Sequence, residues 1–137
     1  MGKLFGTDGI RGVVNAGLDA DLAYKVGLAA AEVLASGKKA GEKPLVTIGK
    51  DTRISGDLLK GSLIAGLCTA GADVLDLGTL PTPGVAWVTV DEGADAGIVI
   101  SASHNPFEHN GIKIFNGQGF KLSDELEEKI EEIVLFG

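Results

Sequence analysis

Segments whose hydrophobic residues have helical spacing alternate along the chain with short apolar segments typical of strands. Between residues 20 and 36 they recur every three or four positions, which places Leu22, Val26 and Val33 on one face of a predicted helix. Short apolar runs, each typical of a buried strand, follow at residues 45–48, 74–77 and 96–100. This alternation of helices and strands predicts an α/β domain with a mostly parallel sheet.

Three more helices are predicted between and after these strands. Ser55 can cap a helix whose inner face carries leucines. These are Leu59, Leu63 and Leu67. Thr82 followed by Pro83 is typical of an N-cap with proline at the first helical position, and predicts a short helix. Ser123 precedes a last helix, whose first turn carries acidic residues at the positive end of the helix dipole.

A fourth strand, predicted at residues 111–115, differs from the others in how the chain reaches it. The connection from residue 100 to residue 111 has no helix pattern, although a right-handed parallel crossover normally contains a helix. We therefore expect this last strand to be antiparallel to its neighbour. Residues 1–137 are then expected to form one three-layer α/β/α domain around a mixed, mostly parallel sheet.

Composition narrows the function classes. The formal net charge of −7 argues against a nucleic-acid surface, which would carry a basic stripe, and against binding to anionic membranes. The apolar runs are too short to span a bilayer. The single cysteine, Cys68, fits a reducing cytoplasm, and its place on a helix predicts a buried side chain.

The loop at residues 101–110 contains both histidines of the chain and follows a buried strand. In open α/β sheets, ligands gather at the carboxyl ends of strands, so this loop should share one edge with two other polar loops. Ser103 and His104 lack the Gly-x-Ser-x-Gly context of a serine hydrolase. The spacing of His104, Glu108 and His109 is not a strong zinc pattern. The glycine-rich nucleotide-binding motifs are absent, so no nucleotide cofactor is expected.

Phosphoryl chemistry on a serine is the interpretation that remains for this loop. Phosphoryl transfer needs positioned cations more than covalent help from the protein, and Arg11, His104, Lys113 and a bound Mg²⁺ could supply them. Two interpretations stay open for Lys113. By alternation it is a lysine on the solvent face of an edge strand, whereas its place near Ser103 also suits a general acid or base.

Several motifs, taken together and in this order, resemble those of the α-D-phosphohexomutase family. They cover almost the whole chain: FGTDGIRG at 5–12, GKDTRISG at 49–56, PTPGVAW at 81–87, SASHNP at 101–106 and NGIKIF at 110–115. The form with Ser101, where many members more often have Thr, is most similar to the bacterial branch that acts on glucosamine phosphates.

The resemblance implies a mechanism and a set of site residues. Ser103 would carry a phosphoryl group, donate it to a sugar phosphate and recover the other phosphoryl group from a bisphosphorylated intermediate. The phosphoryl group on Ser103 would be one ligand of Mg²⁺. Arg11 would bind the phosphoserine, Lys113 would act as general acid/base, and His104 would help to position the reacting groups. The substrate pair implied for this branch is glucosamine 6-phosphate and glucosamine 1-phosphate.

The same resemblance implies that further domains complete the site. Family members have four domains, and this sequence matches only the first, so the expected partners are the remaining domains of the same enzyme and the sugar phosphate. We expect the isolated chain to bind Mg²⁺ weakly or not at all and to show no measurable mutase turnover. Two alternatives remain: the first domain of a phosphoglucomutase or phosphomannomutase, or a non-catalytic domain that self-associates through apolar surface. The candidates for that surface are Trp87, Val88 and the C-terminal helix, although their apolar character alone predicts core residues.

Overall fold

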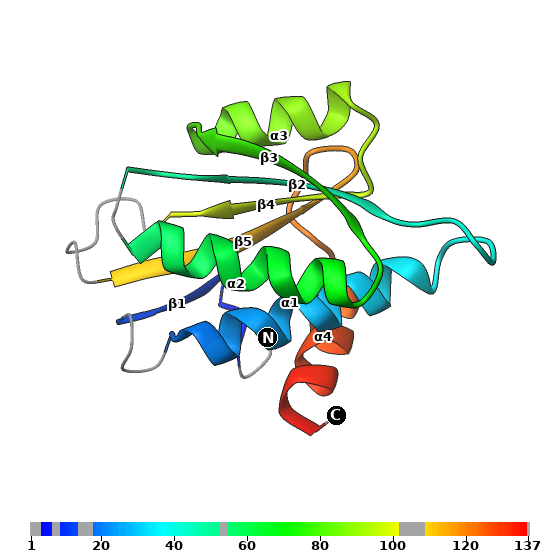
Figure 1. Ribbon diagram of the computed structural model, residues 1–137, viewed down its shortest axis with the longest axis horizontal. Coiled ribbons are helices and arrows are strands. Elements are labelled where there is room, and N and C mark those ends of the chain that lie inside the picture. Colours follow the sequence, from blue (N-terminus) through cyan, green and yellow to red (C-terminus); the bar gives the residue numbers. More distant parts are fainter. Residues whose placement is uncertain (1–3, 7–8, 14–17, 53–54, 102–108, 137) are drawn as a thin grey trace.

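The computed structural model describes residues 4–6, 9–13, 18–52, 55–101 and 109–136, with the backbone alone for residues 11–13 and 109. Nine elements follow one another along these residues (Figure 1). The strands are β1 (Ile10–Val13), β2 (Leu45–Lys50), β3 (Asp73–Thr79), β4 (Ala96–Ile100) and β5 (His109–Asn116). The helices are α1 (Ala20–Ala35), α2 (Ser55–Thr69), α3 (Thr82–Asp91) and α4 (Asp124–Phe136).

The strands form a mixed sheet in the order β1-β5-β4-β2-β3. β2 lies between β3 and β4 and is parallel to both, as expected for strands joined through α2 and α3. β5 is antiparallel to β4, with Ile98 opposite Ile114 and Ile100 opposite Ile112. The predicted antiparallel last strand is therefore confirmed, and its helix-free connection from β4 explains the direction.

The sequence prediction missed β1, which falls inside what looked like a glycine-rich polar loop. Ile10, Arg11, Gly12 and Val13 pair antiparallel with β5, from Ile10 opposite Ile112 to Val13 opposite His109. Four residues that include glycine and arginine are too few to show a strand alternation. The strand forms because β5 offers it a complete row of backbone partners.

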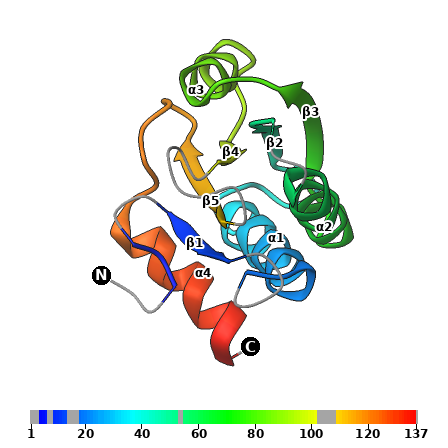
Figure 2. The same cartoon turned by 90° about the vertical axis from the view of Figure 1, so that its left-hand side faces the viewer.

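Helices cover both faces of the sheet, which confirms the predicted three-layer α/β/α fold (Figure 2). α1 and α2 pack together on one face, above a core that includes Val46, Ile48 and Ile98. α3 lies on the other face against β2 and β4. There the Thr47 and Thr89 hydroxyls share a buried 2.7 Å hydrogen bond between the sheet and α3. α4 packs against α1.

The first residues of the helices follow the predictions to within a residue. The Asp19 carboxylate caps α1 by accepting a 2.8 Å hydrogen bond from Leu22 N. α3 begins at Thr82 rather than after it, with Pro81 as its N-cap. Ser55 is the first residue of α2, and its hydroxyl contacts another element of the site described below.

Two expected burials are wrong. Cys68 is exposed, because the buried stripe of α2 runs through Leu63 and Leu67, and the next residue in a helix turns about 100° away. Trp87 is 66% exposed, since Val85 and Thr89 hold the inner face of α3 and Trp87 lies between them on the outer face. None of the helices in the described part of the chain has the length and apolar character needed to cross a membrane.

Candidate active site

The carboxyl ends of three parallel strands meet at one edge of the sheet, as predicted for the polar loops. Lys50, the last residue of β2, is opposite Ile100 in β4 and Thr79 in β3. Backbone hydrogen bonds continue past the strands, from Asp51 N to the Ile100 carbonyl and from Leu80 N to the Lys50 carbonyl, both 3.0 Å long. The loops that begin at residues 51, 80 and 101 therefore start side by side.

Ser103 and His104, which carry most of the predicted chemistry, lie outside the described residues. The described flanks show where their segment leaves and rejoins the sheet. Ser101 N donates a 3.0 Å hydrogen bond to the Gly111 carbonyl, so the end of β4 and the start of β5 are joined at this edge. His109 is the first residue of β5, and only its backbone is described.

Arg11 is brought to the same region by β1. Its backbone is opposite Gly111 of β5, whereas its side chain lies outside the described atoms. Gly9, two residues earlier, has a φ of +88° and lies so close to β5 that an added Cβ would come within 3.1 Å of Lys113 Cγ. A glycine is needed here for both its backbone conformation and its lack of a side chain.

Lys113 lies in the middle of β5, opposite Val99 of β4. Its neighbours Ile112 and Ile114 point into the core below α1 and α2, so strand alternation places Lys113 on the other face. There its half-buried side chain lines a hollow of about 170 Å³. The hollow is lined by Gly9, Thr82, Lys113, Ile114, Phe115, Lys121 and Glu127. Lys113 is thus neither a fully solvated lysine nor a core residue.

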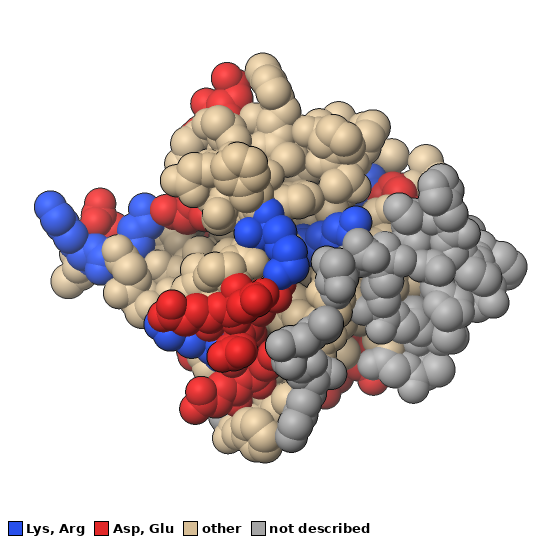
Figure 3. All heavy atoms as spheres, turned by 180° about the vertical axis from the view of Figure 1, so that it is seen from behind, with Lys and Arg blue, Asp and Glu red and all other residues tan. Residues whose placement is uncertain are grey.

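Two lysines line this hollow, and their charges are balanced differently. Lys121 Nζ lies 3.0 Å from Glu127 Oε1 and 3.4 Å from Asp124 Oδ1. The hydrogen bond with Glu127 raises the pKa of Lys121 above its ordinary value, although desolvation works in the opposite direction. Within the described residues, no carboxylate lies at ion-pair distance from Lys113. Figure 3, which shows the molecule from behind, has basic side chains gathered in its middle and acidic side chains below them.

A second cation lies at the strand edge itself. The Lys50 side chain is 12% exposed, and its Nζ lies 3.3 Å from both Asp57 Oδ1 and the Asp51 carbonyl oxygen. Gly56 packs against it, since a Cβ there would come within 3.1 Å of Lys50 Cδ. Lys50 belongs to the GKDTRISG stretch at 49–56, but the sequence alone assigned it no role. Its near-burial beside the loops is visible only in the structure.

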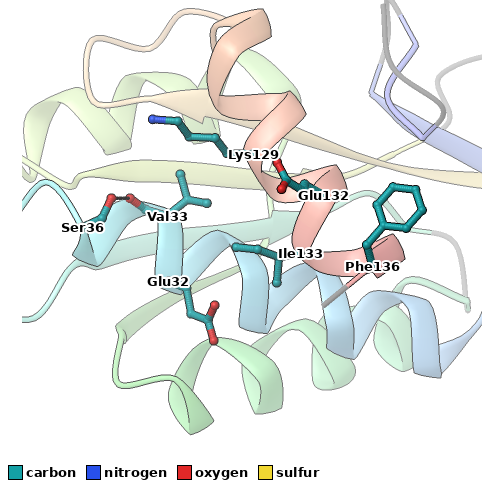
Figure 4. A pocket seen from close by; sticks show the side chains of 7 residues that line it. All are labelled: Glu32, Val33, Ser36, Lys129, Glu132, Ile133 and Phe136. Atoms are coloured by element: carbon teal, nitrogen blue, oxygen red, sulfur yellow. Dashed lines mark hydrogen bonds between the residues drawn. The ribbon is translucent and has the colours of Figure 1, made fainter.

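A larger hollow, of about 460 Å³, lies between α1 and α4 (Figure 4). Its side chains are Glu32, Val33, Ser36, Lys129, Glu132, Ile133 and Phe136. None of the predicted site residues lines it, and the Ser36 hydroxyl is already bonded to the Val33 carbonyl at 2.7 Å. Of the two hollows, the smaller one is therefore the one lined by a predicted site residue, Lys113.

The described residues do not by themselves form a magnesium site. Among them, no group of three or more histidine, cysteine, aspartate or glutamate side chains could hold a metal ion. The one predicted ligand, the phosphoryl group of Ser103, falls outside the described part of the chain. Binding of Mg²⁺ through that group therefore stays a prediction of the sequence.

A family model described as "Phosphoglucomutase/phosphomannomutase, alpha/beta/alpha domain I" matches residues 2–135. The chain therefore belongs to the phosphoglucomutase/phosphomannomutase family and contains its domain I, as the motifs indicated. This family defines the class of protein. Several relatives are highly similar to the chain in sequence.

Those relatives are phosphoglucosamine mutases. The enzyme from Acetivibrio thermocellus is 62% identical over 135 residues, which are 98% of this chain and 30% of that protein. The enzyme from Moorella thermoacetica is 59% identical over 135 residues, with the same coverage. The chain thus spans about 30% of the length of the curated relatives it matches.

Solved structures agree on the fold. A putative phosphomannomutase from Thermus thermophilus has a TM-score of 0.86 at 29% identity, covering 95% of this chain and 29% of that one. A phosphoglucomutase/phosphomannomutase family protein from Burkholderia thailandensis has a TM-score of 0.76 at 35% identity, covering 96% of this chain and 30% of that one. Both matches again correspond to one part of a longer protein.

Proposed function

We propose that this chain is the phosphoserine-bearing first domain of a phosphoglucosamine mutase. The observation that carries the proposal is its 62% identity, over 98% of its length, to a protein named phosphoglucosamine mutase. The geometry supports the same chemistry, because the strand after the Ser103 segment carries a half-buried lysine beside a hollow at the sheet face. The substrates would be glucosamine 6-phosphate and glucosamine 1-phosphate.

In the proposed reaction, the phosphoryl group on Ser103 Oγ passes to a hydroxyl of the sugar phosphate. The other phosphoryl group of the resulting bisphosphate then passes to Ser103. In the first half, the P–O bond to Ser103 breaks while a P–O bond to the sugar forms. The sugar hydroxyl loses one proton and Ser103 Oγ gains one, so a group must hold a proton in transit. Lys113 is our candidate, with no carboxylate among the described residues to fix its proton in an ion pair.

Arg11 and His104 complete the proposed set. Arg11 would bind the phosphoserine through its guanidinium, whose parallel donors match phosphate oxygens. Its strand is paired with β5, which supports a place beside Lys113. His104, adjacent to Ser103, would position the reacting groups. Mg²⁺, when bound, would neutralise charge on the transferring phosphoryl group, and its other ligands would come from the remaining domains.

Two measurements test the proposal. Both use a hybrid in which the chain replaces the matching part of the Acetivibrio thermocellus enzyme. First, the intact mass of the hybrid after incubation with glucosamine 1,6-bisphosphate should rise by one phosphoryl group, and its Ser103→Ala variant should show no increase. Second, conversion of glucosamine 6-phosphate by the hybrid is followed in a coupled assay. We expect turnover in the hybrid, none in its Ser103→Ala variant, and none from the 137-residue chain alone.

A matched hybrid separates the sugar alternatives. The same chain is joined to the remainder of the Burkholderia thailandensis family protein and assayed with glucose 1-phosphate and mannose 1-phosphate. Higher turnover in this second hybrid than in the first would favour a phosphoglucomutase or phosphomannomutase domain. A first hybrid that works equally well with Ser103→Ala would contradict the assigned role of Ser103.

A further inference from the structure

Asn110 is a fully buried polar side chain in β5 for which neither the motifs nor the comparisons supply a role. Its exposure is 0%, although asparagine is disfavoured in strand interiors. Both ends of its amide are bonded: Nδ2 donates to Ser55 Oγ over 2.9 Å, and Oδ1 accepts from Gly111 N over 2.9 Å. An unpaired buried amide would be costly, so this arrangement is maintained only while Ser55 stays in place.

The Asn110–Ser55 hydrogen bond joins two elements that are far apart in the sequence. Ser55 is the first residue of α2 and follows the loop that begins at Lys50. Asn110 is the second residue of β5 and follows the segment that contains Ser103. The bond therefore fixes the start of the Lys113 strand against the start of a helix at the edge where the loops meet.

Strand alternation relates this bond to Lys113. Asn110 points to the face covered by α1 and α2, while Lys113, three residues later, points to the hollow on the opposite face. The intervening Gly111 is held on both sides, by Ser101 N at its carbonyl and by pairing with Arg11 of β1. A shift of Asn110 would therefore displace the backbone that sets the position of Lys113.

We propose that Asn110, bonded to Ser55, is a positioning residue for the phosphoryl transfer. It touches no reacting atom; it sets the position of β5, and hence of the Lys113 amine, relative to the phosphoryl carrier. The inference rests on the proposed function. Reacting groups misplaced by about 1 Å can cost around 100-fold in rate, so loss of the bond should lower kcat about 10- to 100-fold.

The test uses the Acetivibrio thermocellus hybrid described above, with Ser55→Ala as the leading variant. This change removes the acceptor of the Asn110 amide and leaves the strand itself intact. We expect kcat to fall about 10- to 100-fold with KM changed less than about threefold, because the lysine acts in the transition state. Ser55→Thr keeps the hydroxyl and should restore kcat. Ser62→Ala removes a hydroxyl bonded to the Leu58 carbonyl in the same helix and should leave kcat unchanged.

A second pair of variants separates positioning from stability. Asn110→Ala should lower kcat at least as much as Ser55→Ala, and the double variant should lose no more than Asn110→Ala alone, because Asn110→Ala already removes the bond that Ser55→Ala removes. Asn116→Ala is the control: Asn116 lies at the other end of β5 and accepts hydrogen bonds from Gln118 N and Phe120 N. It should lower the melting temperature without lowering kcat.

The outcomes distinguish this inference from the proposed function. An active hybrid whose kcat is unchanged by Ser55→Ala overturns the positioning role and leaves the proposed function standing. Equal losses of kcat in Ser55→Ala and Ser62→Ala, or in Asn110→Ala and Asn116→Ala, overturn it too, since a general loss of stability would explain them. A hybrid with no turnover before mutation overturns both.

Discussion

Gly27 of α1 and Gly66 of α2 lie against each other where the two helices cross. A Cβ added at Gly27 would come within 2.5 Å of the Leu63 carbonyl oxygen, and one added at Gly66 would collide with the Tyr24 carbonyl oxygen. The absence of both side chains lets the helix backbones approach closely. This crossing fixes the position of α2 against α1. Because the first residue of α2 bonds to Asn110, the helix packing also helps to hold β5 in place.

The crossing gives the first prediction. Gly66→Ala should destabilise the fold by about 1–3 kcal/mol, because the methyl group forces the helices apart. Gly61→Ala is the matched control in the same helix, where an added Cβ meets nothing within 4 Å. It should stabilise α2 by up to about 1 kcal/mol through helix propensity. Urea unfolding followed by circular dichroism measures both, and equal effects of the two changes would contradict the close-packing argument.

Lys113 gives the second prediction, measured in the Acetivibrio thermocellus hybrid. Lys113→Gln should lower kcat by about 10²- to 10⁴-fold, the usual range for loss of a general acid or base. The melting temperature should change little, since the described residues give Lys113 no ion pair to lose. Lys129→Gln, which removes an exposed pair with Glu125 on α4, is the control and should keep full activity. Retained turnover in Lys113→Gln would rule out its role in proton transfer.

The Lys121–Glu127 pair gives the third prediction, about pH. Because the pKa of Lys121 is raised in the folded state, the pair stabilises fully below the ordinary lysine pKa of 10.5 and less as pH rises through the raised value. Lys121→Met should therefore cost up to about 1 kcal/mol at pH 8, and the difference from the unmutated protein should shrink above about pH 10.5. Unfolding free energies at pH 8 and pH 11 check this.

Lys25→Met is the control for that measurement. Lys25 forms an exposed pair with Asp21 one turn away on α1, at 3.0 Å, and such pairs contribute only about 0.3–0.5 kcal/mol. A Lys121→Met penalty no larger than that of Lys25→Met, or one that stays constant to pH 11, would show that the Glu127 pair does not stabilise the fold.

The outer side of α3 gives the fourth prediction. Trp87, Val90 and Phe120 are 66%, 50% and 70% exposed. They lie close together, since a Cβ added at Gly119, beside Phe120, would come within 3.1 Å of Val90 Cγ2. Adjoining apolar side chains of this size favour association. Sedimentation velocity of the isolated chain should show concentration-dependent self-association that Trp87→Lys with Phe120→Glu reduces. Leu58→Lys, on α2, should not change it. A monomeric chain at high concentration would contradict the self-association hypothesis.

Strongly periodic elements were predictable from the sequence, and short or edge elements were not. The helical spacing around Val26 and the leucines of α2 gave the correct inner faces, since three or more buried positions repeat there. β1 gave no such signal, because its stability comes from β5 about a hundred residues later. The exposed positions of Trp87 and Cys68 were misjudged from their apolar character alone.

For the site, the motifs indicated which residues to examine but not how they are held. The hollow beside Lys113 is also lined by Lys121, which follows β5, and by Glu127 of α4. The sequence prediction started this strand at residue 111 and assigned Asn110 to the preceding loop, so neither its place in β5 nor its bond to Ser55 could be inferred. Both relationships depend on tertiary packing between distant segments.

The pairing of β1 with β5 also bears on the order of folding. Ile10 has no strand partner until Ile112 is in place, and Phe5 N bonds to Glu131 Oε2 at a sequence separation of 126. Contacts between such distant segments pay a large loop-closure entropy and form slowly. Closing this edge of the sheet, which brings Arg11 beside the Lys113 strand, should therefore be among the last events as the domain folds. Because Phe5 and Ile10 also belong to the hydrophobic core, a newly made chain would complete its core and bring Arg11 to the candidate site in the same late step.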